Sequence, residues 1–319
     1  MAHDRKFRFG VQFADPGSGD EWYTFAQRAE ELGYSSLTVP DHYLGPGSVK
    51  TGVQTLAAVP AMAAAAAVTK TIQIGCRVFC IDFHHAATLV KEAATIDFLS
   101  NGRLEFGLGA GWVFDEYEAL GLPFDPTPVR MARLTEMIQL VKSFFAGEEL
   151  DINGEHIKVH GYKGTPISGK QPPLMIGGGA QKMLTLAARH ADIVSLNFNN
   201  KAGSVTSGSI QSATAEMTDQ RIQWIKDGAG ARFDQIELEV GAYFTVVTDD
   251  ADKAAGQMAG MFGVETDVMK SHPNALFGTV DQICDEIQSR RDRYGISYIT
   301  VAGRNLEPFA PVVARLTGQ

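Results

Sequence analysis

The chain has 319 residues, of which 45% are hydrophobic and 20% are charged, and its formal net charge is −9. A chain of this composition folds as a globular protein with a sizeable core. The negative charge disfavours non-specific binding to nucleic acid or to an anionic membrane, because there is no basic surface to replace counterions. The three cysteines lack metal-site spacing, so we expect reduced thiols in a cytoplasmic protein and no bound metal.

The longest apolar run covers residues 56–68 and is too short to cross a bilayer. The residues before Phe7 contain no apolar core of the kind found in signal peptides. We therefore expect a small-molecule substrate, neither nucleic acid nor membrane as a partner, and a homodimer as the assembly.

Short apolar segments alternate with amphipathic segments along the chain. Strands are predicted at 7–13, 36–39, 72–79, 103–108, 173–176, 192–196, 236–247 and 298–301. Helices are predicted at 21–32, 55–68, 86–99, 130–145, 180–190, around 221–224, 251–261 and 280–294. Eight such units with right-handed crossovers close most simply into a (β/α)8 barrel, the α/β fold of the TIM barrel. A doubly wound open sheet is the alternative.

Two segments interrupt this alternation. Asn153-Gly154 stands between two alternating runs and predicts a hairpin insertion near residues 147–165. The segment 199–212 is rich in glycine, serine and asparagine and predicts a mobile loop. We interpret residues 1–319 as a single barrel domain with insertions at the C-terminal ends of the strands.

The active site of such a barrel lies at the C-terminal ends of its strands. The fourth strand ends in Gly107, Gly109 and Gly111, where the absence of side chains would let a ligand approach the backbone. A tight turn without a ligand is equally compatible with these glycines. The same rule retains Asn197 and the segment 75–80 as candidates.

Asp41 and His42 follow the second predicted strand directly after Pro40. A carboxylate beside an imidazole can exchange protons near neutral pH. The alternative is an aspartate that stabilises a turn beside a histidine in solvent.

Gly177-Gly178-Gly179 follows a strand and precedes a helix, so its free N–H groups and the helix dipole predict a phosphate site. The alternative is a left-handed turn. Cys76 and Cys80 have no neighbour that would stabilise a thiolate, and by themselves they are interpreted as small packing residues. His84 and His85 are adjacent and point apart, which disfavours a shared metal.

Eight segments together resemble a known family and follow that family's order: AEELGY (29–34), PDH (40–42), IGCRV (74–78), KEAATID (91–97), SNGRLEFGLGAGW (100–112), EYEALG (116–121), PLMIGGG (173–179) and FGTV (277–280). The family is the luciferase-like monooxygenase superfamily, whose (β/α)8 enzymes bind FMN or the deazaflavin coenzyme F420. The surroundings of Trp112 and Glu116 resemble its actinobacterial F420-dependent oxidoreductase branch.

The resemblance implies a set of site residues. The catalytic pair would be Asp41 and His42. A cis peptide between Arg77 and Val78 would support the cofactor ring, and Trp112 stands where sugar-phosphate dehydrogenases of the family carry a catalytic glutamate. The implied cofactor-binding residues are Asp41, Cys76, Arg77, Val78, Cys80, Ala110, Gly111, Trp112, Gly177, Gly178, Gly179 and Asn197.

The activity that the resemblance implies is hydride transfer between F420 and a small organic substrate. Aromatic residues predicted at the mouth suggest an uncharged or aromatic substrate; they are Phe13, Phe79, Trp112 and Phe198. The alternative cofactor is FMN, in a monooxygenase that uses reduced flavin and oxygen. A barrel glycosidase would need a second carboxylate at a strand end near Asp41, and a cofactor-binding protein without turnover is a further alternative.

Overall fold

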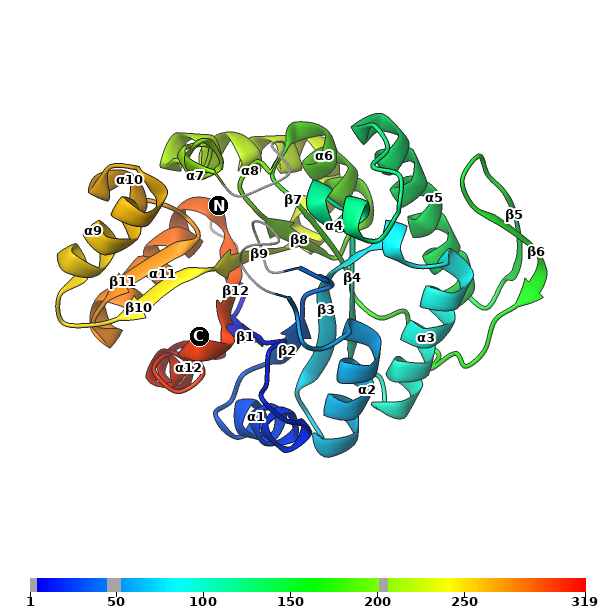
Figure 1. Cartoon of the computed structure of the whole chain (residues 1–319), viewed down its shortest axis with the longest axis horizontal. Coiled ribbons are helices and arrows are strands. Elements are labelled where there is room, and N and C mark those ends of the chain that lie inside the picture. The colour runs from blue at the N-terminus through cyan, green and yellow to red at the C-terminus, as the bar shows by residue number, and fades with distance from the viewer. Residues whose placement is uncertain (1–4, 45–52, 201–205) are drawn as a thin grey trace.

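The computed structural model describes residues 5–44, 53–200 and 206–319 (Figure 1). Its centre is a closed barrel of parallel strands in the order β1-β12-β9-β8-β7-β4-β3-β2. The barrel strands are β1 (Arg8–Gln12), β2 (Ser36–Val39), β3 (Gln73–Cys80), β4 (Leu104–Gly109), β7 (Leu174–Gly178), β8 (Ile193–Leu196), β9 (Glu237–Ala242) and β12 (Ile296–Ala302). The predicted (β/α)8 barrel is confirmed, and the open sheet is wrong.

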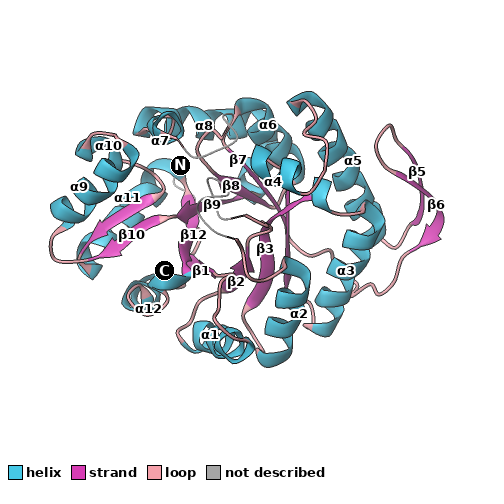
Figure 2. Ribbon diagram, in the orientation of Figure 1, coloured by secondary structure: helices cyan, strands magenta, loops and turns pink. Residues whose placement is uncertain are grey.

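Helices surround the barrel on its outer side (Figure 2). They are α1 (Gly19–Glu31), α2 (Ala58–Val68), α3 (Ala86–Leu99), α4 (Phe114–Ala119), α5 (Thr127–Phe145), α6 (Gln181–His190), α7 (Ser207–Gln211), α8 (Ala215–Ala229), α9 (Ala251–Phe262), α10 (Thr266–Lys270), α11 (Val280–Tyr294) and α12 (Ala310–Leu316). Short 3-10 segments are η2 (Ile81–Phe83), η3 (Gly230–Gln235) and η4 (Gly303–Asn305). None of these described helices is long and apolar enough to cross a membrane.

The two faces of the strands differ in composition. Outward residues such as Phe9, Leu37 and Phe106 are buried against the helices in the main hydrophobic core. Inward residues include charges: Arg8 makes ion pairs with Glu105 and Glu237 near the amino ends of the strands. Because the interior is held by such pairs, it is more polar than the layers of branched apolar residues usual in this fold.

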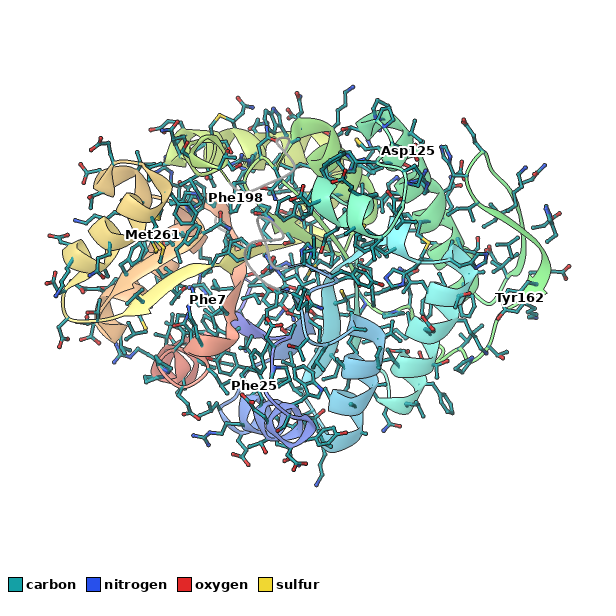
Figure 3. All side chains as sticks on the ribbon, in the orientation of Figure 1. Phe7, Phe25, Asp125, Tyr162, Phe198 and Met261 are labelled. Carbon is teal, nitrogen blue, oxygen red and sulfur yellow. The ribbon has the colours of Figure 1, made fainter. Side chains whose placement is uncertain are left out.

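Two additions lie on opposite sides of the barrel in Figure 1. The antiparallel hairpin of β5 (Glu149–Asn153) and β6 (Lys158–Lys163) corresponds to the hairpin predicted from sequence. The second addition is the pair β10 (Phe244–Val247) and β11 (Ala275–Gly278), covered by α9 and α10. Figure 3 labels Tyr162 on the hairpin and Met261 on the far side, on α9.

The structure corrects two predicted segments. The strand predicted at 236–247 is two strands, because β9 stays in the barrel whereas β10 leaves it to pair with β11. The loop predicted at 199–212 contains helix α7, which Thr206 caps and whose Ile210 is fully buried. Capping and burial favour this helix despite its glycine and serine content. Residues 201–205 of that segment lie outside the described residues.

Candidate active site at the mouth of the barrel

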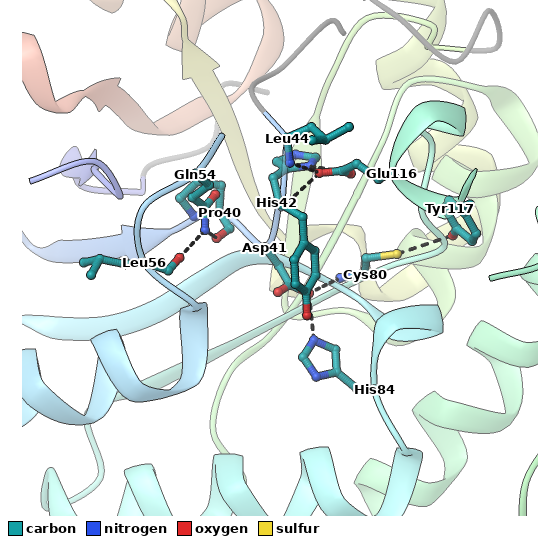
Figure 4. A network of polar contacts seen from close by, with 11 residues as sticks. Pro40, Asp41, His42, Leu44, Gln54, Leu56, Cys80, His84, Glu116 and Tyr117 are labelled. Carbon is teal, nitrogen blue, oxygen red and sulfur yellow. Dashed lines mark hydrogen bonds and ion pairs between the residues drawn. The ribbon is translucent and has the colours of Figure 1, made fainter. Parts of the chain in front are cut away.

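Asp41 follows β2 and is buried at the edge of the mouth. Its Oδ2 accepts hydrogen bonds from the Cys80 backbone N–H at 2.9 Å and from His84 Nε2 at 2.8 Å (Figure 4). The carboxylate therefore joins the end of β2 to the end of β3 and to the segment before α3. It is a fixed anchor at the edge of the mouth.

His42 lies beside Asp41, and its Nδ1 contacts both carboxylate oxygens of Glu116 on α4, at 2.9 and 3.1 Å. Glu116 also accepts the backbone N–H groups of Tyr43, at 2.7 Å, and Leu44, at 3.0 Å (Figure 4). Burial would raise the pKa of Glu116, but these hydrogen bonds and the His42 imidazole outweigh it, so the pKa is lowered.

This arrangement determines which histidine nitrogen is free to act. An ionised carboxylate only accepts hydrogen bonds, so Nδ1 of His42 carries the hydrogen and Nε2 is left to exchange a proton. The imidazole is 22% exposed and packs edge-to-face on Trp112, with ring centroids 5.9 Å apart. His42, Glu116 and Trp112 therefore form one wall of the mouth.

The turn after β4 is fixed from two sides. Arg130 donates to the carbonyls of Ala110 and Gly111. Gly111 has a φ of +70°, and a Cβ there would lie 1.8 Å from the Tyr117 hydroxyl. That hydroxyl donates to Asp82 at 2.8 Å and lies 3.4 Å from the Cys80 sulfur. Burial raises the pKa of the Cys80 thiol, so it is a neutral packing group here.

The second wall is formed around Arg77 on β3, whose guanidinium reaches across the barrel to β9. Its side chain is 4% exposed, and Nε lies 2.9 Å from Oε1 of Glu239, which is fully buried. Nη2 lies 3.1 Å from the hydroxyl of Tyr243, the residue directly after β9. Gln12 contacts Arg77 from the end of β1. Arg77 therefore connects residues from β1, β3 and β9 across the barrel.

The peptide between Arg77 and Val78 is cis, as the resemblance implies. Val78 points into the barrel, packing with Met175, Ile193 and Tyr298. By contrast, the neighbouring Cys76 is buried in the layer between strands and helices. The register of β3 is irregular between Cys76 and Phe79, which explains why Cys76 and Val78, two residues apart, do not share a side of the sheet. A role for Cys76 in cofactor binding stays a prediction.

The phosphate site predicted at Gly177-Gly178-Gly179 overlaps the end of β7. Gly177 and Gly178 belong to the strand, and none of the three has a positive φ. A Cβ on Gly178 would meet the Met183 side chain, and one on Gly179 would meet the carbonyls of residues 197 and 198. These glycines are therefore explained by contacts within the chain, and the alternative of a left-handed turn is wrong.

A buried arginine lies behind this segment. Arg221 on α8 donates to the carbonyls of Gly179 at 3.0 Å and Ser212 at 2.7 Å. Burial lowers its pKa to about 10, and it pairs with no carboxylate in the described parts of the chain. The first turn of α6 begins at Gln181 with no side-chain cap. Positive charge and free N–H groups thus coincide at the end of β7.

A model of the luciferase-like monooxygenase family matches residues 7–296. The chain belongs to this family.

Curated relatives of this luciferase-like chain carry names of two kinds. It is 31% identical over 171 residues to an F420-dependent glucose-6-phosphate dehydrogenase of Amycolatopsis mediterranei, a match of 53% of this chain and 50% of the relative. It is 29% identical over 264 residues to the pyrimidine monooxygenase RutA of Pseudomonas syringae, covering 74% and 71%. The chain thus spans about half the length of the first relative.

Among solved structures, the fold is similar to the coenzyme F420 dependent tetrahydromethanopterin reductase of Methanopyrus kandleri. The TM-score is 0.78 at 17% identity, with 98% of this chain and 99% of the reductase covered. At this identity the likeness establishes the barrel fold. Family membership supports an enzyme of the oxidoreductase or monooxygenase kind. It does not decide between F420 and FMN, so the cofactor is argued from the site.

Four residues of this luciferase-like site were not predicted as site residues: Glu116, Tyr117, Arg221 and Tyr243. Glu116 and Tyr117 lie in a segment that carries the family resemblance, which is the signal that could have found them. Of the aromatic residues expected at the mouth, Phe79 is fully buried in the core and Phe13 packs with Trp22 and Phe25. Those two expectations are wrong.

Proposed function

We propose that this protein transfers a hydride between coenzyme F420 and a small organic substrate at the barrel mouth. The observation that carries the proposal is the pair His42–Glu116, which leaves Nε2 of His42 free beside Trp112. Hydride transfer to or from an organic substrate is accompanied by movement of a proton, and an imidazole can exchange it near neutral pH. Relatives named as F420-dependent support this cofactor.

The ring would lie between Val78 and the turn at Ala110–Gly111. Val78 is half-buried, and the glycines of β4 approach its methyl groups so closely that any Cβ there would meet them. Arg130 holds the carbonyls of the turn and so fixes its position. A bound deazaflavin supplies a ring carbon that accepts or donates the hydride. The task of these residues is to orient the ring.

The phosphate would lie at the N-terminus of α6. The uncapped first turn provides N–H groups, and buried Arg221 provides a cation that lacks an acidic partner in the described chain. An anion is stabilised by both. Because Gly178 and Gly179 pack against the chain itself, we assign the binding to the helix N-terminus and the arginine.

The proposed substrate is a small uncharged or aromatic molecule. Trp112 occupies the position where the resemblance places a catalytic glutamate in sugar-phosphate dehydrogenases, and its ring is half-buried beside His42. This argues against a sugar phosphate as substrate, even though the curated relatives include such dehydrogenases.

Anaerobic titrations of the cofactor-free protein with F420 and with FMN test the proposal. We expect F420 to bind at least about tenfold more tightly than FMN, a difference of about 1.4 kcal/mol. Arg221→Met should weaken binding of F420 but not of a deazaflavin that lacks phosphate, whereas Arg189→Met, at an exposed position on α6, should change neither. Tight binding of FMN with no binding of F420 would reject the proposal.

The second candidate is a flavin monooxygenase. The observation in its favour is the longer match to the pyrimidine monooxygenase, 74% of this chain compared with 53% for the dehydrogenase. Oxygen consumption with FMN and a reductant would support this candidate.

A further inference from the structure

The hydroxyl of Tyr243 has an unusual pair of neighbours at the mouth. Nη2 of Arg77 and Nδ2 of Asn197 each lie 3.1 Å from it. Tyr243 directly follows β9 and Asn197 directly follows β8, so both are at the C-terminal end of the barrel. The tyrosine is half-buried, and Arg304 fixes its backbone carbonyl at 2.7 Å.

Both neighbours are hydrogen-bond donors. A guanidinium has only donors. The amide of Asn197 is oriented by its Oδ1, which accepts the Phe198 backbone N–H at 2.9 Å, so Nδ2 faces Tyr243. The phenol oxygen therefore accepts two hydrogen bonds, and its own hydrogen has no acceptor among the described residues.

The positions of both donors are set independently of Tyr243. Arg77 is held by Glu239, and Asn197 is held by the backbone of Phe198. A Cβ on Gly241 would lie 2.4 Å from Nη2 of Arg77, so only glycine allows the guanidinium to reach the phenol. Both donors point at the phenol oxygen from positions that other contacts hold, and the hydroxyl hydrogen is left without an acceptor among the described residues.

We infer that Tyr243 donates its hydroxyl hydrogen to the oxygen of a ketone or aldehyde substrate in the mouth. This inference rests on the proposed function and names the substrate class. When a hydride with its electron pair bonds to the carbonyl carbon, the C=O π pair moves to oxygen, and that oxygen takes the Tyr243 proton to give an alcohol. The phenolate that remains keeps its bonds from Arg77 and Asn197 and regains a proton from water.

The test compares Tyr243→Phe with Tyr23→Phe, a matched change at an exposed tyrosine on α1. The probe is cyclohexanone, and the readout is the infrared C=O stretch of the bound ketone in protein loaded with oxidised F420. A hydrogen bond to the oxygen lowers this frequency. We expect the low-frequency band in the wild type and in Tyr23→Phe, and a band at higher frequency in Tyr243→Phe.

Turnover of cyclohexanone with reduced F420 is the second measurement. We expect kcat of Tyr243→Phe to fall about 100-fold or more while the Kd for F420 stays unchanged. Equal carbonyl bands in wild type and Tyr243→Phe, or no binding of the ketone to the wild type, would overturn the inference.

These outcomes separate the inference from the proposed function. If F420 does not bind, the proposed function fails, and the infrared measurement on ketone bound to the cofactor-free protein still reads the Tyr243 hydrogen bond. If F420 binds and the ketone band does not depend on Tyr243, only the inference fails.

Discussion

The two walls of the barrel mouth differ in how their charges are held. On one wall, His42 is 22% exposed and pairs with buried Glu116. On the other, Arg77 and Glu239 are 4% and 0% exposed and pair inside the barrel. An imidazole changes protonation near neutral pH, whereas a guanidinium stays charged. The difference indicates that His42 can exchange protons at the open side of the mouth, while Arg77 supplies a fixed charge and fixed geometry to the residues beside it, Tyr243 included.

Breaking the arginine wall should have the largest effect on stability. Arg77→Met leaves Glu239 buried without its cation, and loss of one partner of a buried ion pair costs about 3–5 kcal/mol. Urea denaturation measures the free energy of unfolding. Arg28→Met removes an exposed ion pair with Glu307 and should change stability little. Equal effects of the two substitutions would contradict the buried pair.

The second-largest expected effect on stability is that of Asp41→Ala, which we compare with His42→Ala. Asp41→Ala leaves the Cys80 N–H and His84 without their acceptor, which should cost about 2–3 kcal/mol. His42→Ala should destabilise less, because its Nε2 side is open to the mouth, yet it should lose more turnover per folded molecule. Denaturation and activity of the two variants measured side by side check this. The opposite ranking would make Asp41 the acid–base residue.

The strand-end rule and the family resemblance both place Asp41 and His42 at the end of the second strand, which is where the structure has them. Neither could show that the Asp41 carboxylate is held by hydrogen bonds whereas one nitrogen of His42 is not. The partner of His42, Glu116, lies 74 residues away, and only the closed barrel brings α4 beside β2. Local patterns carry no information on such a contact. The strand-end rule predicts at which end of the barrel a residue lies. Only the tertiary contacts show that Asp41 is held by hydrogen bonds whereas His42 keeps a free nitrogen.

Tyr243 was missed for a different reason. Residues 236–247 form one continuous apolar pattern, which local periodicity interprets as one strand. The strand actually ends at Ala242, the last residue paired with β12, and β10 then pairs with β11. Choice of pairing partner is a tertiary effect, so the mouth residue between the two strands could not be recognised from sequence.

Lowering the pH should reduce the contribution of Glu116 to the free energy of unfolding. The pKa of Glu116 is lower in the folded chain than its ordinary value of 4.5, so its contribution to stability is present above that value and is lost as pH falls through the folded pKa. Glu116→Gln should therefore cost about 1 kcal/mol at neutral pH and much less in acid. Unfolding free energies of both proteins at about pH 7 and about pH 3 measure this. A pH-independent difference would contradict the ionised carboxylate.

The smallest expected effect concerns the contact between His42 and Trp112. Their rings meet edge-to-face at 5.9 Å, and aromatic pairs of this geometry contribute about 0.5–1.5 kcal/mol beyond the area they bury. A double-mutant cycle of His42→Ala and Trp112→Ala isolates this coupling from the separate costs of each truncation. In a second cycle, Trp112→Phe replaces Trp112→Ala. We expect a smaller coupling energy from this cycle, because the phenyl ring keeps part of the contact with the imidazole. Strict additivity of the two alanine substitutions would show that Trp112 does not position His42, and the histidine wall would then depend on Glu116 alone.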